Sequence, residues 1–453
     1  MALVRIIETA EFCEYQKTIR AEADETAETG DKAAVSAAVK EIIAAVRAEG
    51  DVAVRRYAKL YEKRVPDKFE VPIEAAREAW ENLKTNEPDL AAALTLAADN
   101  IRRFAELQKE QFRDFETEIA PGLFTGQRVI PVERSAAYVP AGRFPLISTA
   151  LMTLIPAAAA NVREKILVSP PGEDGLPDRR ILAAAYMAGA DRIFALGGAQ
   201  AIAALALGTE TIPRADLIVG PGNKYVAEAK RRLFGEAGID FVAGPTDVLV
   251  ITDSGAKSAG ATAKSAEFIA ADMLAQAEHD PDARARALVP DAETAKQIER
   301  ALEKRIAALP TAAAVKASLE AGGLIIIYKT REEAISIANL IAPEHLELQT
   351  ASPEEWTSGL KNYGSLFIGA SAAEVLGDYS AGINHTLPTS SSARFTGGLS
   401  VRHFLKTVTT LRCTEGPGYA KALSAAEIIA GAEGLAGHAE SAAIRINAGS
   451  KKQ

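Results

Sequence analysis

The chain has 453 residues, of which 48% are apolar and 25% are charged, with a net charge of -9 and a sequence pI near 5.4. This length predicts about three domains with several buried cores. The acidic balance argues against a general affinity for nucleic acid or an anionic membrane, although a local basic pocket for an anionic ligand stays possible.

The opening stretch, MALVRIIETAEFCEYQ, lacks the apolar segment of a secretion signal. The longest apolar-rich run, ALMTLIPAAAANV, is too short to span a bilayer. Cys13 and Cys413 show no CxxC spacing, which predicts free thiols and excludes an all-cysteine zinc site. We therefore expect a cytoplasmic protein without disulfides.

The first part of the chain has helical periodicity. Residues 32–51 place apolar side chains at helical spacing and end at a glycine, and the runs VPIEAAREAWENL and LAAALTLAADNIRRFAELQKEQF continue the pattern. From about residue 128 the pattern changes to short strand–turn–helix units, beginning with KILVS, RIFAL and DLIVG. DVLVIT, LIIIYK and SLFIGA form a second such series, so the sequence predicts parallel sheets covered by helices.

Two glycine turns follow predicted strands. Gly197-Gly198 opens a helix and could present backbone N–H groups to a phosphate, but the fingerprint GxGxxG is absent. The turn in VGPGNKYV contains Asn223, whose amide could contact a ligand. Taken alone, each turn is better explained by packing than by ligand binding.

Two pairs of polar residues suggest chemistry. Gln276 and His279 lie three apart and share a helix face, which indicates either a metal-binding edge or a polar helix end. Glu344 and His345, in APEHLELQ, offer two proton acceptors with different pKa values. The alternative for this second pair is a helix start with proline in its first turn.

Two further segments carry a carboxylate and a histidine. Asp378 and His385 lie in the glycine-rich GDYSAGINHTLPT, which a simple turn would also explain. Glu433 and His438 lie near the end of a helical tail, which a solvated helix end would also explain.

The use of histidine favours a single site. The chain has five histidines, and only His403 lies in a plain context. The other four lie beside Asp, Glu, Gln or Asn. Nitrogen and oxygen donors without cysteine suit zinc, manganese or another borderline divalent ion.

The ordered segments YVPAGRFPL, GGAQAIAALALGTETIP, IVGPGNKYVAEAKR, AGPTDVLVI, ADMLAQAEHD, APEHLE, GDYSAGINHTLPT and EGLAGH resemble the histidinol dehydrogenase family. The resemblance runs from about residue 30 to residue 447. It implies an enzyme that uses zinc and NAD, and it assigns roles to individual residues.

The implied zinc ligands are Gln276, His279, Asp378 and His438. The implied catalytic pair is Glu344 and His345, and the residues expected to contact NAD are Tyr138, Gln200 and Asn223. The residues expected to contact substrate are Thr246, Gln276, His279, His345, Asp378, His385, Glu433 and His438.

The resemblance also implies an α/β fold with two lobes, each holding an incomplete Rossmann-like parallel sheet, plus small helical appendages in an intertwined homodimer with shared active sites. We expect residues 1–28 to form an N-terminal helical appendage. Residues 29–127 and 240–380 are expected to form the catalytic and metal-binding lobe, and residues 128–239 the NAD-binding lobe. Residues 381–453 are expected to form a C-terminal helical appendage that reaches the partner subunit.

The implied reaction is a four-electron oxidation of a primary alcohol to a carboxylate through an aldehyde, with L-histidinol as the leading substrate. His345 would take the alcohol proton, and Glu344 would activate water for attack on the aldehyde. The substrate is small, with no nucleic acid or membrane partner expected.

The chain departs from the histidinol enzymes at several positions. Thr246-Asp247 replaces Ser-Glu, YVPAGR replaces YVPGG, and Thr-Gly-Gly in ARFTGGLSVRHF resembles a side branch typified by sulfopropanediol dehydrogenase. Arg143 and Arg394 could bind the anionic group of such a diol. A diol-oxidising paralogue is therefore the first alternative. A catalytically silent binding protein is the second, although the retained ligands and bases argue against it.

Overall fold

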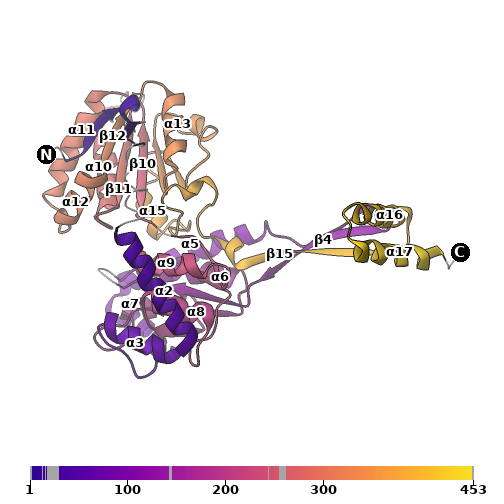
Figure 1. The fold of residues 1–453 in the computed structure, drawn as a ribbon. Coiled ribbons are helices and arrows are strands. Elements are labelled where there is room, and N and C mark those ends of the chain that lie inside the picture. The colour runs from indigo at the N-terminus through magenta and orange to yellow at the C-terminus, as the bar shows by residue number, and fades with distance from the viewer. Residues whose placement is uncertain are drawn as a thin grey trace.

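The protein is described by a computed structural model that covers residues 3–12, 14–15, 17, 30–141, 145–242, 244–254 and 262–450. Two lobes, each built on a six-stranded sheet, lie beside each other, and a long arm extends away from them (Figure 1). We call the lobe that contains the described residues of 30–110 and 132–242 lobe 1. Lobe 2 contains the described residues of 3–12 and 244–380.

The sheet of lobe 1 has the strand order β2-β7-β6-β5-β8-β9, in which all strands except β2 are parallel. Its strands are β2 (Glu70–Val71), β5 (Arg134–Tyr138), β6 (Glu164–Ser169), β7 (Arg192–Ala195), β8 (Leu217–Val219) and β9 (Gly238–Ile239). The connecting helices are α6 (Ile147–Ala159), α7 (Arg179–Met187), α8 (Gly198–Leu207) and α9 (Lys224–Leu233). The order reverses between β5 and β8, which makes the carboxyl ends of these two strands a topological switch point.

Four N-terminal helices cover this same sheet. They are α2 (Asp31–Glu49), α3 (Asp51–Tyr61), α4 (Ile73–Asn86) and α5 (Pro88–Lys109). Val39 of α2 packs in one core with Ile166 of β6, and Ile101 of α5 packs in another with Leu167 of the same strand. The expectation that residues 29–127 join residues 240–380 is therefore wrong for the helices. Their apolar faces are buried on the two sides of the lobe 1 sheet.

The sheet of lobe 2 has the order β1-β12-β11-β10-β13-β14 and is parallel throughout. Its strands are β1 (Arg5–Glu8), β10 (Asp247–Thr252), β11 (Arg284–Val289), β12 (Leu324–Ile327), β13 (His345–Gln349) and β14 (Ser365–Ile368). Its helices are α10 (Thr262–Ala277), α11 (Ala292–Ile306), α12 (Ala312–Gly322), α13 (Arg331–Ile341), α14 (Glu354–Thr357) and α15 (Glu374–Tyr379).

The start of the chain is not a separate helical appendage. β1 pairs in parallel with β12 and extends the edge of the lobe 2 sheet, because its buried Ile7 packs into the core of that lobe. Residues 18–28 of the expected appendage lie outside the described residues, as does Cys13.

The arm is a three-stranded antiparallel sheet followed by two helices. It contains β3 (Phe115–Ala120), β4 (Leu123–Pro131), β15 (Leu405–Cys413), α16 (Pro417–Ala432) and α17 (Ala436–Ser450), with the strand order β15-β4-β3. Figure 1 shows the arm reaching away from both lobes, with the C-terminus near its tip. Leu411 and Ile428 are each 68% exposed, so the arm presents apolar surface that this single chain leaves uncovered.

The segment 381–404 belongs to the body of the protein rather than to a C-terminal appendage. It includes the short 3-10 helices η2 (Ser392–Arg394) and η3 (Val401–Phe404), and Leu399, Val401 and Phe404 are buried in the core of lobe 1. The expected appendage of residues 381–453 therefore begins near Leu405, and it contains a strand as well as helices.

The fold class is confirmed: both lobes contain a Rossmann-like parallel sheet. In each sheet the five strands β7-β6-β5-β8-β9 or β12-β11-β10-β13-β14 follow one topology, and an added strand lies at one edge. No helix among the described residues has the length and apolar character needed to cross a bilayer.

Phe404 provides a test of the corrected boundary. Phe404→Ala should lower the free energy of unfolding by about 3–5 kcal/mol, because the side chain is fully buried and its loss leaves a cavity. Denaturant unfolding of the purified variant measures this change. Phe395→Ala, at a site 82% exposed in the same segment, is the matched control and should change stability little. Equal stability of both variants would contradict the assignment of residues 381–404 to the body of the protein.

Candidate active site

A cavity of about 170 Å³ lies where lobe 1, lobe 2 and the segment 381–404 meet. It is lined by Leu146, Ser148, Thr149, Pro221, Phe241, Gly244, Thr246, His279, Glu344, His345, Glu374, Asp378, Tyr379, His385, Thr386, Leu387 and Thr389. None of these residues is Lys or Arg. Predicted site residues from four separate segments of the sequence are thereby brought to one place: Thr246, His279, the pair Glu344 and His345, and Asp378 with His385.

The two sheets use opposite edges to build the cavity. In lobe 1, Pro221 follows the carboxyl end of β8, at the switch point where α/β folds usually bind ligands. In lobe 2, Thr246 precedes β10 and Glu344 precedes β13, so the amino ends of these strands face the cavity. One wall therefore has the usual geometry of a cofactor site, and the other carries ionisable side chains.

Glu344 lies in a tight turn between α13 and β13. Ala342 ends α13 in a left-handed conformation, with φ of 51°, and β13 begins at His345. The alternative that this pair starts a helix is therefore wrong. The Glu344 carboxylate accepts hydrogen bonds from the Thr246 hydroxyl and, at 3.2 Å, from the Asp247 backbone N–H.

Burial controls the acidity of Glu344. The residue is 5% exposed, and this burial raises the pKa of its carboxyl to about 7, although the charge of His345 acts in the opposite direction. A carboxyl with a pKa near neutrality can exist as a base at physiological pH and still accept a proton readily.

His345 lies between two carboxylates. Its Nδ1 atom is 3.3 Å from Glu374 Oε1, and its Nε2 atom is 3.5 Å from Asp378 Oδ1. Burial opposes a charge on the ring, but the carboxylates of Glu374, Glu344 and Asp378 together raise the His345 pKa well above its usual value. The imidazole is thus placed to take up a proton and to be stabilised as the cation.

Glu374 was not predicted from the sequence. It is 2% exposed, its backbone N–H donates to Glu347 Oε1 at 2.8 Å, and burial raises its pKa well above the usual value. It lies four residues before Asp378, so both carboxylates project from the same face of α15. The spacing of four residues between Glu374 and Asp378 was the feature of the sequence that could have identified Glu374 as a site residue.

A metal ion could be held at this cluster. Ligand atoms of His345, Glu374 and Asp378 lie within 4.8 Å of one another. The buried carboxylates outnumber the one imidazole between them, and among the described lining residues there is no lysine or arginine to balance them. A divalent cation would supply the missing positive charge.

Gln276 lies beside the cavity and is fully buried in the last turn of α10. One atom of its amide is 2.6 Å from Thr246 Oγ1 and the other is 2.5 Å from Glu374 Oε1. The amide nitrogen donates to Thr246 Oγ1 in one orientation of the amide and to Glu374 in the other. Just beyond the helix end, His279 is exposed and lines the cavity.

The remaining predicted site residues are distributed as follows. His385 lines the cavity; its Nδ1 atom is 2.8 Å from the Asp378 carbonyl oxygen and its Nε2 atom is 3.3 Å from Thr149 Oγ1. Glu433 and His438 are exposed on the arm and do not line this cavity. Of the four predicted metal ligands, His279 and Asp378 therefore line the cavity of one chain, Gln276 contacts the lining residues Thr246 and Glu374, and His438 does not line it.

The three residues expected to contact NAD lie at the carboxyl edge of the lobe 1 sheet. The hydroxyl of the buried Tyr138 accepts from Gly198 N at 3.1 Å, and the buried Gln200 donates to Glu62 at 3.3 Å. Asn223 caps α9, because its side-chain oxygen accepts hydrogen bonds from the backbone N–H groups of Tyr225 and Val226. All three side chains have partners within lobe 1.

Glu62 occupies the Gly197-Gly198 turn and was also missed by sequence reasoning. Its Oε1 atom accepts from Gly197 N at 2.8 Å, at the start of α8. Burial raises the Glu62 pKa to about 7. The N–H group of Gly197 is thereby bound by a carboxylate of the chain itself, so phosphate binding at this turn would require Glu62 to move.

Of the two arginines considered for an anionic group, only Arg394 falls within the described residues, and it does not line the cavity. Arg143 lies outside the described residues. Arg394 is exposed and donates to the Leu340 carbonyl oxygen.

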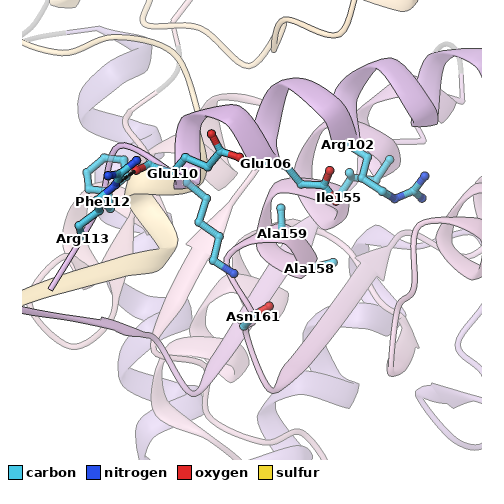
Figure 2. A pocket seen from close by; sticks show the side chains of 10 residues that line it. Arg102, Glu106, Glu110, Phe112, Arg113, Ile155, Ala158, Ala159 and Asn161 are labelled. Atoms are coloured by element: carbon cyan, nitrogen blue, oxygen red, sulfur yellow. Dashed lines mark hydrogen bonds between the residues drawn. The ribbon is translucent and has the colours of Figure 1, made fainter.

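A larger surface hollow lies between α5 and α6 (Figure 2). Its volume is about 670 Å³, and it is lined by Arg102, Glu106, Lys109, Glu110, Phe112, Arg113, Ile155, Ala158, Ala159 and Asn161. It contains no histidine, and its acidic and basic side chains alternate along the end of a solvated helix. This hollow is not the candidate active site.

Comparison with known proteins identifies the family. The histidinol dehydrogenase family profile matches residues 25–446. The histidinol dehydrogenase of Thermus thermophilus is 45% identical over 90% of this chain and 93% of the relative, and that of Methylococcus capsulatus is 42% identical over 90% and 91%. A histidinol dehydrogenase homolog of Shouchella clausii is 38% identical over 91% and 94%.

A solved structure agrees with these relatives. The histidinol dehydrogenase of Elizabethkingia anophelis superposes with a TM-score of 0.83 at 34% identity, covering 90% of this chain and 92% of the other. The agreement extends over both lobes, because a match of this coverage cannot come from one lobe alone. The chain therefore belongs to the histidinol dehydrogenase family of oxidoreductases.

Proposed function

We propose that this protein is a zinc- and NAD-dependent enzyme that oxidises L-histidinol to L-histidine through the aldehyde, in the last steps of histidine biosynthesis. The observation that carries the proposal is the adjacent pair of buried bases, Glu344 and His345, in a cavity next to a Rossmann-like switch point. The relatives named histidinol dehydrogenase, at 42–45% identity, support the choice of substrate.

The chemistry of the donor set suits a zinc ion. Gln276, His279 and Asp378 would hold it from this chain, with carboxamide, imidazole and carboxylate donors, and His438 of a second copy would complete the set. The excess of buried carboxylates around His345 favours a cation at this place. When bound, zinc supplies a Lewis-acidic anchor that orients the substrate, and NAD accepts the hydrides.

The two bases divide the proton transfers. His345 takes the proton of the substrate alcohol in its neutral form, which a bound cation would favour by offsetting the charge of the surrounding carboxylates, and the flanking Glu374 and Asp378 stabilise the resulting imidazolium. Glu344 takes a proton from the water that attacks the aldehyde, a role suited to a carboxyl whose pKa is about 7. The Thr246 hydroxyl and the Asp247 N–H hold the Glu344 carboxylate in place.

NAD is placed in lobe 1. Tyr138, Gln200 and Asn223 lie around the carboxyl ends of its strands, and Pro221 brings this edge to the cavity wall. A hydride acceptor here would lie across the cavity from His345, which suits removal of the hydroxyl proton on one side and of a hydride from the adjoining carbon on the other.

The arm supports a dimer with shared sites. Glu433 and His438 are exposed at its end, and its apolar side chains are uncovered in one chain. We propose that the arm of each copy lies on the other, so that His438 ligates the partner's zinc and Glu433 pairs with the substrate ammonium.

The anionic-diol alternative is not favoured. A sulfonate would need arginine or several N–H donors around it. The described residues that line the cavity include neither Lys nor Arg, and Arg394 is engaged with a backbone carbonyl.

A comparative assay tests the function. We expect two NADH per histidinol consumed in zinc-loaded protein, little activity after chelation, and no turnover of sulfopropanediol. Absorbance at the NADH band, together with elemental analysis for zinc, measures these quantities. Full activity of metal-free protein, or turnover of the diol alone, would contradict the proposal.

Two variants test the division of roles. His345→Asn should mainly slow alcohol oxidation, and Glu344→Gln should mainly slow aldehyde oxidation, each by about 10²–10⁴-fold. In the unmodified protein the aldehyde step should gain rate as the pH rises through about 7, because Glu344 must lose its proton to act. Single-turnover rates with alcohol and with aldehyde measure both effects. Equal losses on both substrates in both variants would refute separate roles.

Mixed dimers test the shared site. His279→Ala and His438→Ala chains should each be inactive, but exchange of subunits should restore a substantial part of the activity. The heterodimer would then hold one site with both defects and one with neither. Activity before and after exchange is the measurement, with each variant incubated alone as control. If exchange is demonstrated and no activity returns, His438 acts within its own chain.

A further inference from the structure

Lobe 1 contains a deeply buried ion pair that the mechanism above does not use. Lys230 on α9 pairs with Asp240, which directly follows β9, and their side chains are 2% and 0% exposed. Among the ion pairs of Lys or Arg in the described residues, this pair has the least exposed surface. Removing two charges from water is costly, and a buried pair is weak evidence for a gain in stability.

Both members of the pair bind the same loop. Asp240 Oδ2 accepts from the Gly220 N–H at 2.8 Å, and Lys230 Nζ donates to the Gly220 carbonyl oxygen at 2.9 Å. The two peptide groups that flank the Gly220 Cα atom are therefore fixed by opposite charges. Hydrogen bonds to charged groups are stronger than neutral ones, so this loop is held firmly.

The opposite side of Gly220 is fixed as well. Its φ is 106°, and a methyl group added there would collide with the Tyr138 carbonyl oxygen at the end of β5. Gly220 thus lies against one strand end and is held there by the ion pair. The residues after it, Pro221 and Asn223, form the turn at the switch point between β5 and β8.

The same ion pair also contacts Phe241, a second residue of the cavity wall. Asp240 Oδ1 accepts from the Phe241 N–H at 2.7 Å, and Lys230 Nζ lies 5.9 Å from the centre of the Phe241 ring. Phe241 and Pro221 both line the cavity. One buried ion pair therefore determines the place of two lining residues that come from different loops.

We propose that Lys230 and Asp240 are positioning residues for NAD: they fix Gly220 and Phe241, and so hold the Pro221–Asn223 turn in the conformation that receives the cofactor. This inference rests on the proposed function in one respect, the location of NAD in lobe 1. It differs from it in assigning a role to residues that touch neither cofactor nor substrate.

The test removes both charges together. Lys230→Met with Asp240→Asn leaves no unpaired buried charge, so the double variant should fold, but the Gly220 carbonyl loses its donor and one backbone N–H loses its acceptor. We expect NAD to bind at least about tenfold more weakly, with a lower kcat. The KM for histidinol should stay within about twofold, because the zinc ligands and both bases lie in lobe 2 and on the arm.

A matched ion pair serves as control. Lys165 and Asp191 lie at the amino edge of the same sheet, with Nζ 2.7 Å from the carboxylate. Lys165→Met with Asp191→Asn makes the same chemical change away from the cavity and should leave NAD binding unchanged. Direct titration with NAD, thermal unfolding and both KM values are measured for each variant. If the variant Lys230→Met with Asp240→Asn does not fold, Lys230→Gln with Asp240→Asn also leaves no unpaired buried charge, keeps an amide donor near the Gly220 carbonyl oxygen, and should show an intermediate loss of NAD affinity.

The outcomes separate this inference from the proposed function. If the unmodified protein fails to bind NAD, that result contradicts both the proposed cofactor and this inference. NAD binding that is normal in the unmodified protein and equally normal in the Lys230/Asp240 variants overturns the inference alone. The same holds if the control pair loses NAD affinity equally, or if both KM values rise together with a fall in thermal stability.

Discussion

Desolvated negative charge around His345 is the constraint on which the site depends. Glu344, Glu374 and Asp378 are withdrawn from water beside a single imidazole, and burial raises the pKa of the first two. Carboxyls of this kind either hold a proton or require a cation. The cluster therefore specifies the chemistry: it makes one group a base near neutral pH, it stabilises an imidazolium, and it leaves a place for a metal ion.

The two sheets present opposite edges to the cavity, which separates the ionisable side chains from the edge that suits a dinucleotide. A Rossmann-like sheet offers backbone N–H groups and loops at its carboxyl edge, which suit a dinucleotide. Lobe 2 instead turns its amino edge toward the cavity, where Thr246, Glu344 and His345 lie next to one another on adjacent strands. Apposing unlike edges lets one topology supply a cofactor wall on one side and proton acceptors on the other.

Much of the fold could be predicted from local pattern. The apolar runs before glycine turns correspond to β6, β7, β8, β10 and β12, because a strand buried on both faces needs continuous apolar residues. The partner of α2 could not be predicted. The apolar stripe of α2, which includes Val39, indicates that one face of this helix is buried against another element. Helical periodicity alone does not identify which of the two sheets that element is.

The site shows the same limit. Gln276, His279, Glu344, His345, Asp378 and His385 could be singled out because each lies in a short polar break or in a family motif. Glu374, Glu347 and Glu62 were missed because they look like ordinary helix or strand carboxylates, and only tertiary packing buries them. The exposed strand β15 was missed because its alternating threonines lack a core-facing apolar row.

The arm connects stability to function. A two-helix tip and a narrow sheet cannot form a core large enough to bury Leu411 and Ile428, so the surface they present needs a cover from outside the chain. The predicted fourth ligand, His438, lies on this same tip, away from the cavity that His279 and Asp378 line. If one contact between two copies covers the apolar arm and completes the metal site, then that contact both stabilises the arm and raises the affinity for zinc. Association of two chains would then be a condition for chemistry rather than an addition to it.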